Sequence, residues 1–142
     1  MAMNGSMLRV FVTGTSMYPA LFPSDSVIVA QSEAYPLGSI LVFSYKTEGY
    51  LIHRLLRIAK KRYYCKGDNS FRLEDVDEDQ ILGRVVFVKR MGQTFVPTEV
   101  DNKFIDMSLK IYREFVLSGY NHQKVKESDL YIEYKNLYLE AR

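Results

Sequence analysis

The sequence of 142 residues lacks several features that would assign it to a common class of protein. Its single cysteine, Cys65, excludes an internal disulfide, which fits a reducing compartment. No run of about eighteen apolar residues suggests a membrane span, and the opening lacks the charged and then apolar layout of a signal peptide. With 19 basic and 17 acidic residues, the net charge of +2 gives no electrostatic support for a nucleic-acid partner. We therefore expect a cytoplasmic protein without a membrane span, which is compatible with peripheral contact with a membrane or a partner protein. The sequence indicates no oligomeric state.

Ligand patterns for metals and phosphates are also missing. The two histidines, His53 and His122, are far apart in the sequence and no second cysteine accompanies them. The acidic run 74–79 lacks the regular spacing of oxygen ligands found in a calcium loop. Gly14 is the only glycine of its loop, so no glycine-rich phosphate loop is present. We expect no metal and no cofactor.

Short β-forming runs alternate with turn residues from Leu8 to about Arg90, which is typical of a mainly β domain. Two of the runs, 40–43 and 85–88, are apolar throughout, so we expect them to lie centrally with both faces covered. The predicted strands span residues 8–12, 26–30, 39–45, 50–58, 62–66 and 81–90.

The pattern changes after Pro97. A helix is predicted there, with Asp101 or Asn102 as its N-cap and Gly119 as its stop signal. A second segment, 128–140, fits a helix, although part of it also fits a strand, and we favour the helix. We thus predict a β domain over residues 8–92 and a helical C-terminal appendage over residues 93–142, packed on or beside it. The apolar residues of the first helix are Ile105, Leu109, Tyr112 and Val116.

The loop Gly14-Thr15-Ser16-Met17 interrupts two strongly β-forming segments. Gly14 can adopt backbone angles closed to other residues, and Pro19 fixes its own φ, so the loop should be stiff. A hydroxyl on a stiff loop of a rigid sheet is well placed to act as a nucleophile. Serine is also common in ordinary turns, so Ser16 needs partners elsewhere before it indicates any chemistry.

One histidine and one acidic segment supply candidate partners. His53 lies inside an apolar run, where a histidine is either a core residue bonded to a backbone carbonyl or a functional base. His122 lies in a polar turn and is expected to be solvated. The segment Lys66-Gly67-Asp68-Asn69 has the form of a tight turn and is followed by several acids, at least one of which could point inward.

Five segments, in this order and spacing, resemble the serine peptidase superfamily of type I signal peptidases and SOS-response repressors. The resemblance covers roughly residues 8–90 and implies a β-ribbon fold of several antiparallel sheets. Its most specific parts are the Ser-Met-x-Pro loop and the Gly-Asp-Asn turn. A histidine at position 53, where bacterial members normally have a lysine, is similar to the endoplasmic-reticulum and archaeal type of signal peptidase. The segments are Gly14–Leu21, Asp25–Val29, Ile52–Arg54, Lys66–Asn69 and Ile81–Val86.

The resemblance also implies roles for individual residues. Ser16 would be the nucleophile, and His53 the general base and then the general acid. Asp75 would orient His53, with Asp68 as the alternative. The oxyanion site would lie in the loop, with Gly14 where signal peptidases often have a hydroxyl residue. The other acids that compete for the orienting role are Glu74 and Asp77, and the loop residues are Gly14, Thr15, Ser16 and Met17.

These inferences predict a serine endopeptidase that cleaves a signal-like or leader segment from an extended peptide through an acyl-enzyme. Because the residues before Ser16 contain no membrane anchor, we expect a soluble relative rather than an ordinary secretory signal peptidase. The alternative is a catalytically inactive scaffold of the same fold that binds a peptide or a protein. A self-cleaving repressor is disfavoured because no helix-turn-helix precedes the β part.

Overall fold

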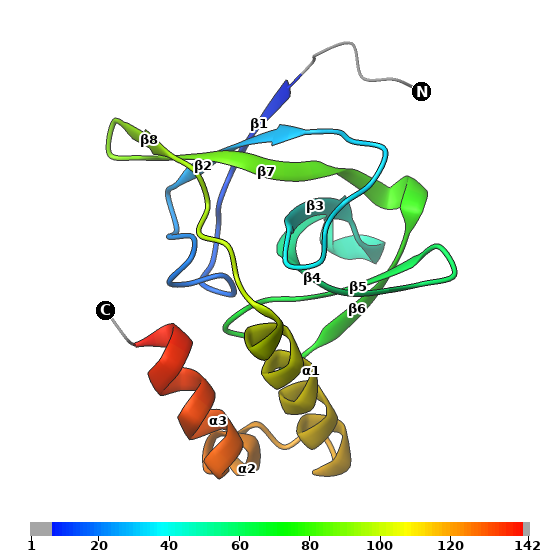
Figure 1. Cartoon of the computed structure of the whole chain (residues 1–142), viewed down its shortest axis with the longest axis vertical. Helices are drawn as coiled ribbons and strands as arrows, with labels where there is room; N and C mark the ends of the chain where they lie inside the picture. The colour runs from blue at the N-terminus through cyan, green and yellow to red at the C-terminus, as the bar shows by residue number, and fades with distance from the viewer. Residues whose placement is uncertain (1–6, 141–142) are drawn as a thin grey trace.

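The computed structural model describes residues 7–140, in which eight strands form one antiparallel sheet (Figure 1). The strand order is β1-β2-β7-β3-β4-β5-β6, and β8 pairs with β7 beside this path. The sheet curls strongly, as β-branched and aromatic strands with a right-handed twist tend to do. The strands are β1 (Met7–Phe11), β2 (Ser26–Ala30), β3 (Ile40–Ser44), β4 (Tyr50–Ala59), β5 (Arg62–Lys66), β6 (Leu73–Asp77), β7 (Ile81–Arg90) and β8 (Gln93–Phe95).

The predicted mainly β fold with a helical C-terminal region is confirmed. The strands are joined into one sheet and do not form several separate ones. β3 lies centrally between β7 and β4 with residues 40–43 buried, as the apolar run predicts. In β7 the expectation of full burial is wrong at Phe87, which is 40% exposed. The pairing of β7 with β2 shifts register between Ile28 and Val29, which interrupts the alternation of buried and exposed side chains there.

β6 was not predicted, and its place in the sheet matters for the site. Its sequence Leu-Glu-Asp-Val-Asp is rich in acids, which are depleted from strands in general. Pairing with β5 over its whole length overrides this weak local preference. The side chains alternate, so Glu74 and Val76 are buried while Asp75 and Asp77 are exposed.

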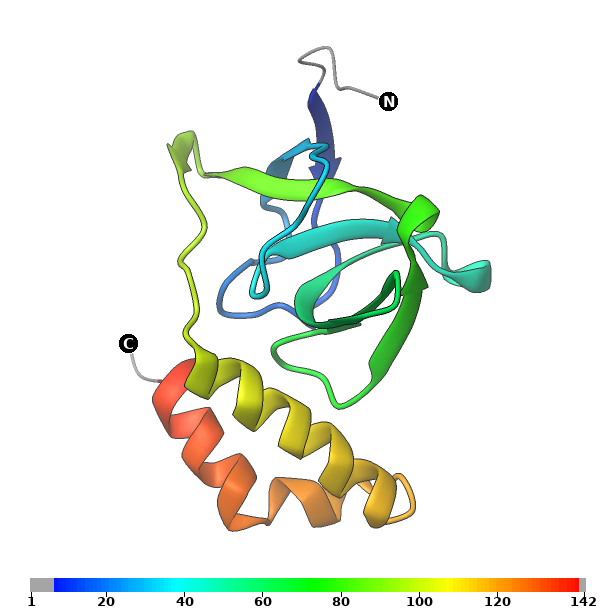
Figure 2. The ribbon, with the colours of Figure 1, turned by 45° about the vertical axis from the view of Figure 1, so that its right-hand side comes forward.

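The C-terminal part forms helices that gather at one end of the curled sheet (Figure 1 and Figure 2). The predicted N-cap Asp101 accepts a hydrogen bond from the backbone N–H of Phe104 at 2.9 Å, and Ser128 caps the later helix in the same way. The short helix at residues 122–126 was not predicted. The helices are α1 (Asn102–Leu117), α2 (His122–Lys126), α3 (Asp129–Tyr134) and the π-helical turn η3 (Lys135–Leu139), and two 3₁₀ turns, η1 (Lys46–Glu48) and η2 (Glu78–Gln80), lie within the β part.

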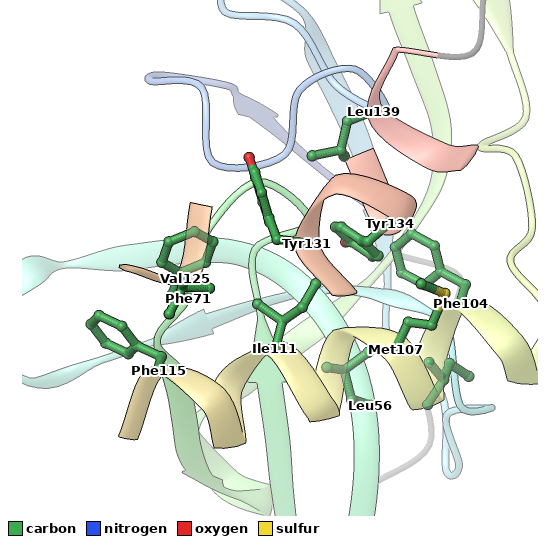
Figure 3. Close-up of a cluster of buried hydrophobic side chains, with 11 residues drawn as sticks. Leu56, Phe71, Phe104, Met107, Ile111, Phe115, Val125, Tyr131, Tyr134 and Leu139 are labelled. Atoms are coloured by element: carbon green, nitrogen blue, oxygen red, sulfur yellow. The ribbon is translucent and has the colours of Figure 1, made fainter. Parts of the chain in front are cut away.

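One hydrophobic cluster joins these helices to the sheet (Figure 3). Leu56 of β4 and Phe71 of the loop before β6 pack against the buried face of α1 and against α3. Ile111, at the centre of that face, is fully buried. Burial of an aliphatic side chain of this size contributes about 1.5–3 kcal/mol, so the helices are held on the sheet by a substantial core. The division into domains near residue 92 stays a prediction.

Among the described helices, none combines the length and the apolar character needed to cross a membrane.

Candidate active site

Ser16 lies in the connection between β1 and β2, and the packing of its neighbours fixes the loop. The side chains of Met17 and Leu21 are buried in the core beneath it. The backbone N–H of Tyr18 donates to the carbonyl of Thr15 at 3.0 Å, and that of Leu21 donates to the carbonyl of Met17 at 2.9 Å. Gly14 has a φ of 75°, in the left-handed region that favours glycine. These contacts favour the stiffness predicted for the loop, which stays a prediction.

Ser16 and His53 are in hydrogen-bond contact. His53 is buried on β4, and its Nε2 lies 2.9 Å from the Ser16 Oγ. The other ring nitrogen, Nδ1, lies 2.7 Å from the Oε1 of Glu74, a side chain with no exposed surface. Because an ionised carboxylate only accepts hydrogen bonds, we assign the ring proton to Nδ1. Nε2 is then left with a lone pair that faces the serine hydroxyl.

The two acids predicted to orient His53 lie elsewhere. Asp75 is on the exposed face of β6, where its carboxylate accepts from the Arg62 Nε at 2.8 Å. Asp68 is buried, but it pairs with Arg54 through contacts of 3.0 and 2.6 Å. The prediction that one of them contacts His53 is wrong, because the alternation of β6 turns Glu74 inward and Asp75 outward. Recognising β6 as a strand, with Val76 on its buried face, would have selected Glu74.

Arg72 holds the second oxygen of Glu74. Its Nε donates to Glu74 Oε2 at 2.9 Å, while its two terminal nitrogens donate to the carboxylate of Glu48 at 2.9 and 3.1 Å. The hydrogen bond from Arg72 keeps the pKa of Glu48 below its usual value, and the Glu48 and Glu74 carboxylates raise that of Arg72 against the opposing effect of burial. Glu74 thus has a partner on each oxygen, as a buried carboxylate requires. Sequence reasoning did not identify this role of Arg72.

The Gly67-Asp68-Asn69 turn presses directly on the Ser16 loop. The backbone N–H of Asn69 donates to the carbonyl of Ser16 at 2.8 Å, and its side-chain amide lies 3.4 Å from the carbonyl of Thr15. A Cβ on Gly67 would lie 2.7 Å from the Ser16 carbonyl oxygen and 3.0 Å from the Ser16 Cβ. Only glycine allows this approach, which is the physical reason for the residue at this point.

Lys66, immediately before the turn, is fully buried. Its Nζ donates to the Ser108 Oγ on α1 at 2.8 Å and lies 5.5 Å from the centre of the Tyr134 ring. Burial lowers the pKa of Lys66 to about 8, although the carboxylates of Asp68 and Glu74 partly oppose this effect. The burial of Lys66 was not predicted from the sequence.

Residues 7–140 contain no cluster of three or more side chains that could hold a metal ion. His122, expected to be solvated, is exposed at the start of α2 and stacks on Phe71.

A comparison with protein families found a match. The family model described as Peptidase S24-like matches residues 3–86, which is more than half of the chain. The chain belongs to the peptidase S24-like family. The matched range contains Ser16, His53 and Glu74, whereas the helices of the C-terminal part lie outside it. A comparison with curated proteins found no match.

Membership of the peptidase S24-like family confirms the predicted superfamily and gives the chain a serine-peptidase type of scaffold. The closer likeness to the endoplasmic-reticulum and archaeal signal peptidases stays a prediction.

Proposed function

We propose that this protein is a serine endopeptidase that cleaves a signal-like or leader segment from an extended peptide. Ser16 is the nucleophile, His53 the general base, and Glu74 the carboxylate that orients His53. The observation that carries the proposal is the continuous pair of contacts, 2.9 Å from Ser16 to His53 and 2.7 Å from His53 to Glu74. A serine hydroxyl is almost fully protonated at neutral pH, so it needs a base within this reach.

The chemistry follows in two half-reactions. His53 Nε2 takes the proton of Ser16 as its Oγ attacks the scissile carbonyl carbon, and returns that proton to the leaving amine when the C–N bond breaks. A water molecule then gives a proton to His53 and attacks the ester on Ser16. His53 Nε2 then gives that proton to the Ser16 Oγ as the ester C–O bond breaks and the new carboxylic acid leaves. Glu74 stays ionised throughout and stabilises the imidazolium form of His53.

Backbone donors serve the oxyanion in this proposal. Within the described part of the chain, the N–H of Ser16 donates to no other group, which leaves it available for the negative oxygen of the tetrahedral intermediate. Gly14 supplies no hydroxyl for this purpose. The stiff loop, packed through Met17 and gripped by Asn69, keeps the donor in place before the reaction starts.

The substrate is proposed to bind as an extended strand. β1 lies at the end of the sheet path and runs directly into the Ser16 loop, so its free edge leads a paired peptide toward the nucleophile. Leu8 and Phe11 of β1 are 50% and 65% exposed, and they offer apolar contacts along that edge. Main-chain pairing of this kind gives affinity, and we propose that the surface beside the cut selects small residues.

The proposal is tested by cleavage and by labelling. Wild type, Ser16→Ala and His53→Ala are incubated with a pool of synthetic leader-like peptides, and the products are read by mass spectrometry. A fluorophosphonate probe is applied in parallel. We expect peptide cleavage and labelling of Ser16 in the wild type only. Peptide binding without cleavage, together with no labelling, would instead identify an inactive binding scaffold. Full activity in either variant would refute the proposed roles.

A further inference from the structure

One tyrosine of the C-terminal helices contacts the Gly67-Asp68-Asn69 turn beside the candidate active site. Tyr134, at the end of α3, is 1% exposed, and its hydroxyl donates to the backbone carbonyl of Asp68 at 2.7 Å. Burial raises the pKa of the Tyr134 phenol above its usual value, so the hydroxyl is protonated and can donate a hydrogen bond at neutral pH. Figure 3 shows Tyr134 directed inward between α3 and Phe104 of α1.

Two further contacts from α1 support the same turn. The Ser108 Oγ accepts a hydrogen bond of 2.8 Å from the Nζ of Lys66, the residue before Gly67. The ring of Phe104 lies 5.4 Å from the guanidinium carbon of Arg54, and Arg54 in turn holds both oxygens of Asp68. Arg54 of β4 therefore holds the side chain of Asp68 in this turn, and Tyr134 of α3 holds the backbone carbonyl of the same residue.

The same turn carries the nucleophile loop on its other side. Asn69 donates to the Ser16 carbonyl at 2.8 Å, and the backbone N–H of Asp68 lies 3.4 Å from the Met17 sulfur. At Gly67 the approach leaves no room for even a methyl group. A displacement of the turn by a few tenths of an ångström therefore also moves Ser16, because the turn and the Ser16 loop are in direct backbone contact.

We propose that Tyr134 is a positioning residue for Ser16 and that the C-terminal helices complete the peptidase site. Tyr134 holds the Asp68 carbonyl, the turn holds the Ser16 loop, and the Ser16 hydroxyl thereby stays in line with His53. Its effect on turnover rests on the proposed function. Its effect on the turn does not, because the contacts exist whether or not a peptide is cleaved. The helices lie outside the range matched by the family model.

The test compares Tyr134→Phe with Tyr131→Phe in the full chain. Tyr131 is a second buried tyrosine on α3, packed edge-on against Phe71, and its hydroxyl bonds to no described residue. Amide hydrogen exchange is measured at Asn69, whose N–H reports the grip on Ser16, and at Ile111 as a reference in the core of α1. Both kcat and KM are measured on whichever peptide of the pool the wild type cleaves.

In Tyr134→Phe we expect exchange at Asn69 to rise at least tenfold relative to Ile111. We also expect kcat to fall by about 10- to 100-fold, as small misplacements of catalytic groups do, with KM within about twofold. Tyr131→Phe should leave all of these unchanged. If the wild type cleaves nothing, the proposed function fails, and exchange at Asn69 alone decides the inference.

Unchanged exchange at Asn69 and unchanged kcat in a folded Tyr134→Phe variant would overturn the inference. An equal rise of exchange at Asn69 and Ile111 would do so as well, since it reports general loosening of the fold. If Tyr134→Phe does not fold, Ser108→Ala replaces it under the same measurements. Exchange at Asn69 that matches the wild type in that variant overturns the inference.

Discussion

Replacement of the buried Lys66 by methionine is expected to raise the free energy of unfolding at neutral pH. Burial lowers the pKa of Lys66 to about 8 from the 10.5 of an ordinary lysine. The lowered pKa means that the charged form of Lys66 is less stable in the folded state than in the unfolded state. Below pH 8 lysine is charged in both the folded and the unfolded chain, so the full cost of burying it is present there.

The magnitude follows from the shift. One pKa unit corresponds to about 1.4 kcal/mol, so the buried charge costs the fold about 3 kcal/mol at pH 7. Methionine fills a similar volume without charge, but it loses the hydrogen bond to Ser108, which contributes about 1 kcal/mol. The net gain expected for Lys66→Met is therefore about 2 kcal/mol.

The change of this stability difference with pH tests the sign of the predicted effect. Between pH 8 and 10.5 the unfolded wild type still holds the proton that folded Lys66 has released, so the wild type gains stability as the pH rises. The advantage of the variant should shrink through this window and become a deficit of about 1 kcal/mol above it. Urea denaturation of both proteins at several pH values measures the difference, and Lys103→Met, at an exposed lysine, is the control. A variant less stable than the wild type at pH 7, or a difference that does not change with pH, would refute the reasoning.

Three further predictions concern the site and its support. Glu74→Gln should keep the fold but lower kcat by about 10³- to 10⁴-fold, because an amide cannot stabilise the imidazolium form of His53. The control Asp75→Asn should keep kcat within twofold of the wild type. Steady-state kinetics measure both variants, and equal losses of kcat would contradict the assignment of Glu74. Gly67→Ala should leave the circular dichroism spectrum unchanged and reduce fluorophosphonate labelling of Ser16 at least tenfold, since the new Cβ meets the Ser16 carbonyl at 2.7 Å; labelling at the wild-type rate would show that the turn yields. Ile111→Ala should lower the free energy of unfolding in urea by about 2–5 kcal/mol, and a loss below 1 kcal/mol would mean that α1 does not share the core.

Much of the sheet could be predicted because hydrophobic pattern and turn residues agree there. The strands at 26–30, 62–66 and 81–90 have the predicted bounds, and Asp101 caps α1 as expected. In these segments local preference and tertiary pairing favour the same state, so the sequence is informative. The order of the motifs predicts a contact between Ser16 and His53, and the Ser16 Oγ lies 2.9 Å from the His53 Nε2.

The acid that contacts His53 could not be predicted because its position depends on a strand without strand composition. Five acids crowd residues 74–79, and only the pairing of β6 with β5 decides which of them faces inward. A shift of one residue in register would exchange Glu74 for Asp75. The burial of Lys66 and the contact of Tyr134 with Asp68 were equally hidden, because they depend on where the helices pack.

The hydrogen bond between Tyr134 and Asp68 also has a consequence for how the protein is made. The two residues are 66 positions apart in the chain, with Tyr134 the later. At a synthesis rate of about 5–20 residues per second, roughly 3–13 s pass between the emergence of one and the other. During that interval the Ser16 loop and the Gly67-Asp68-Asn69 turn lack the hydrogen bond from Tyr134. A chain synthesised in this order completes the proposed site only after its own C-terminal helices have folded.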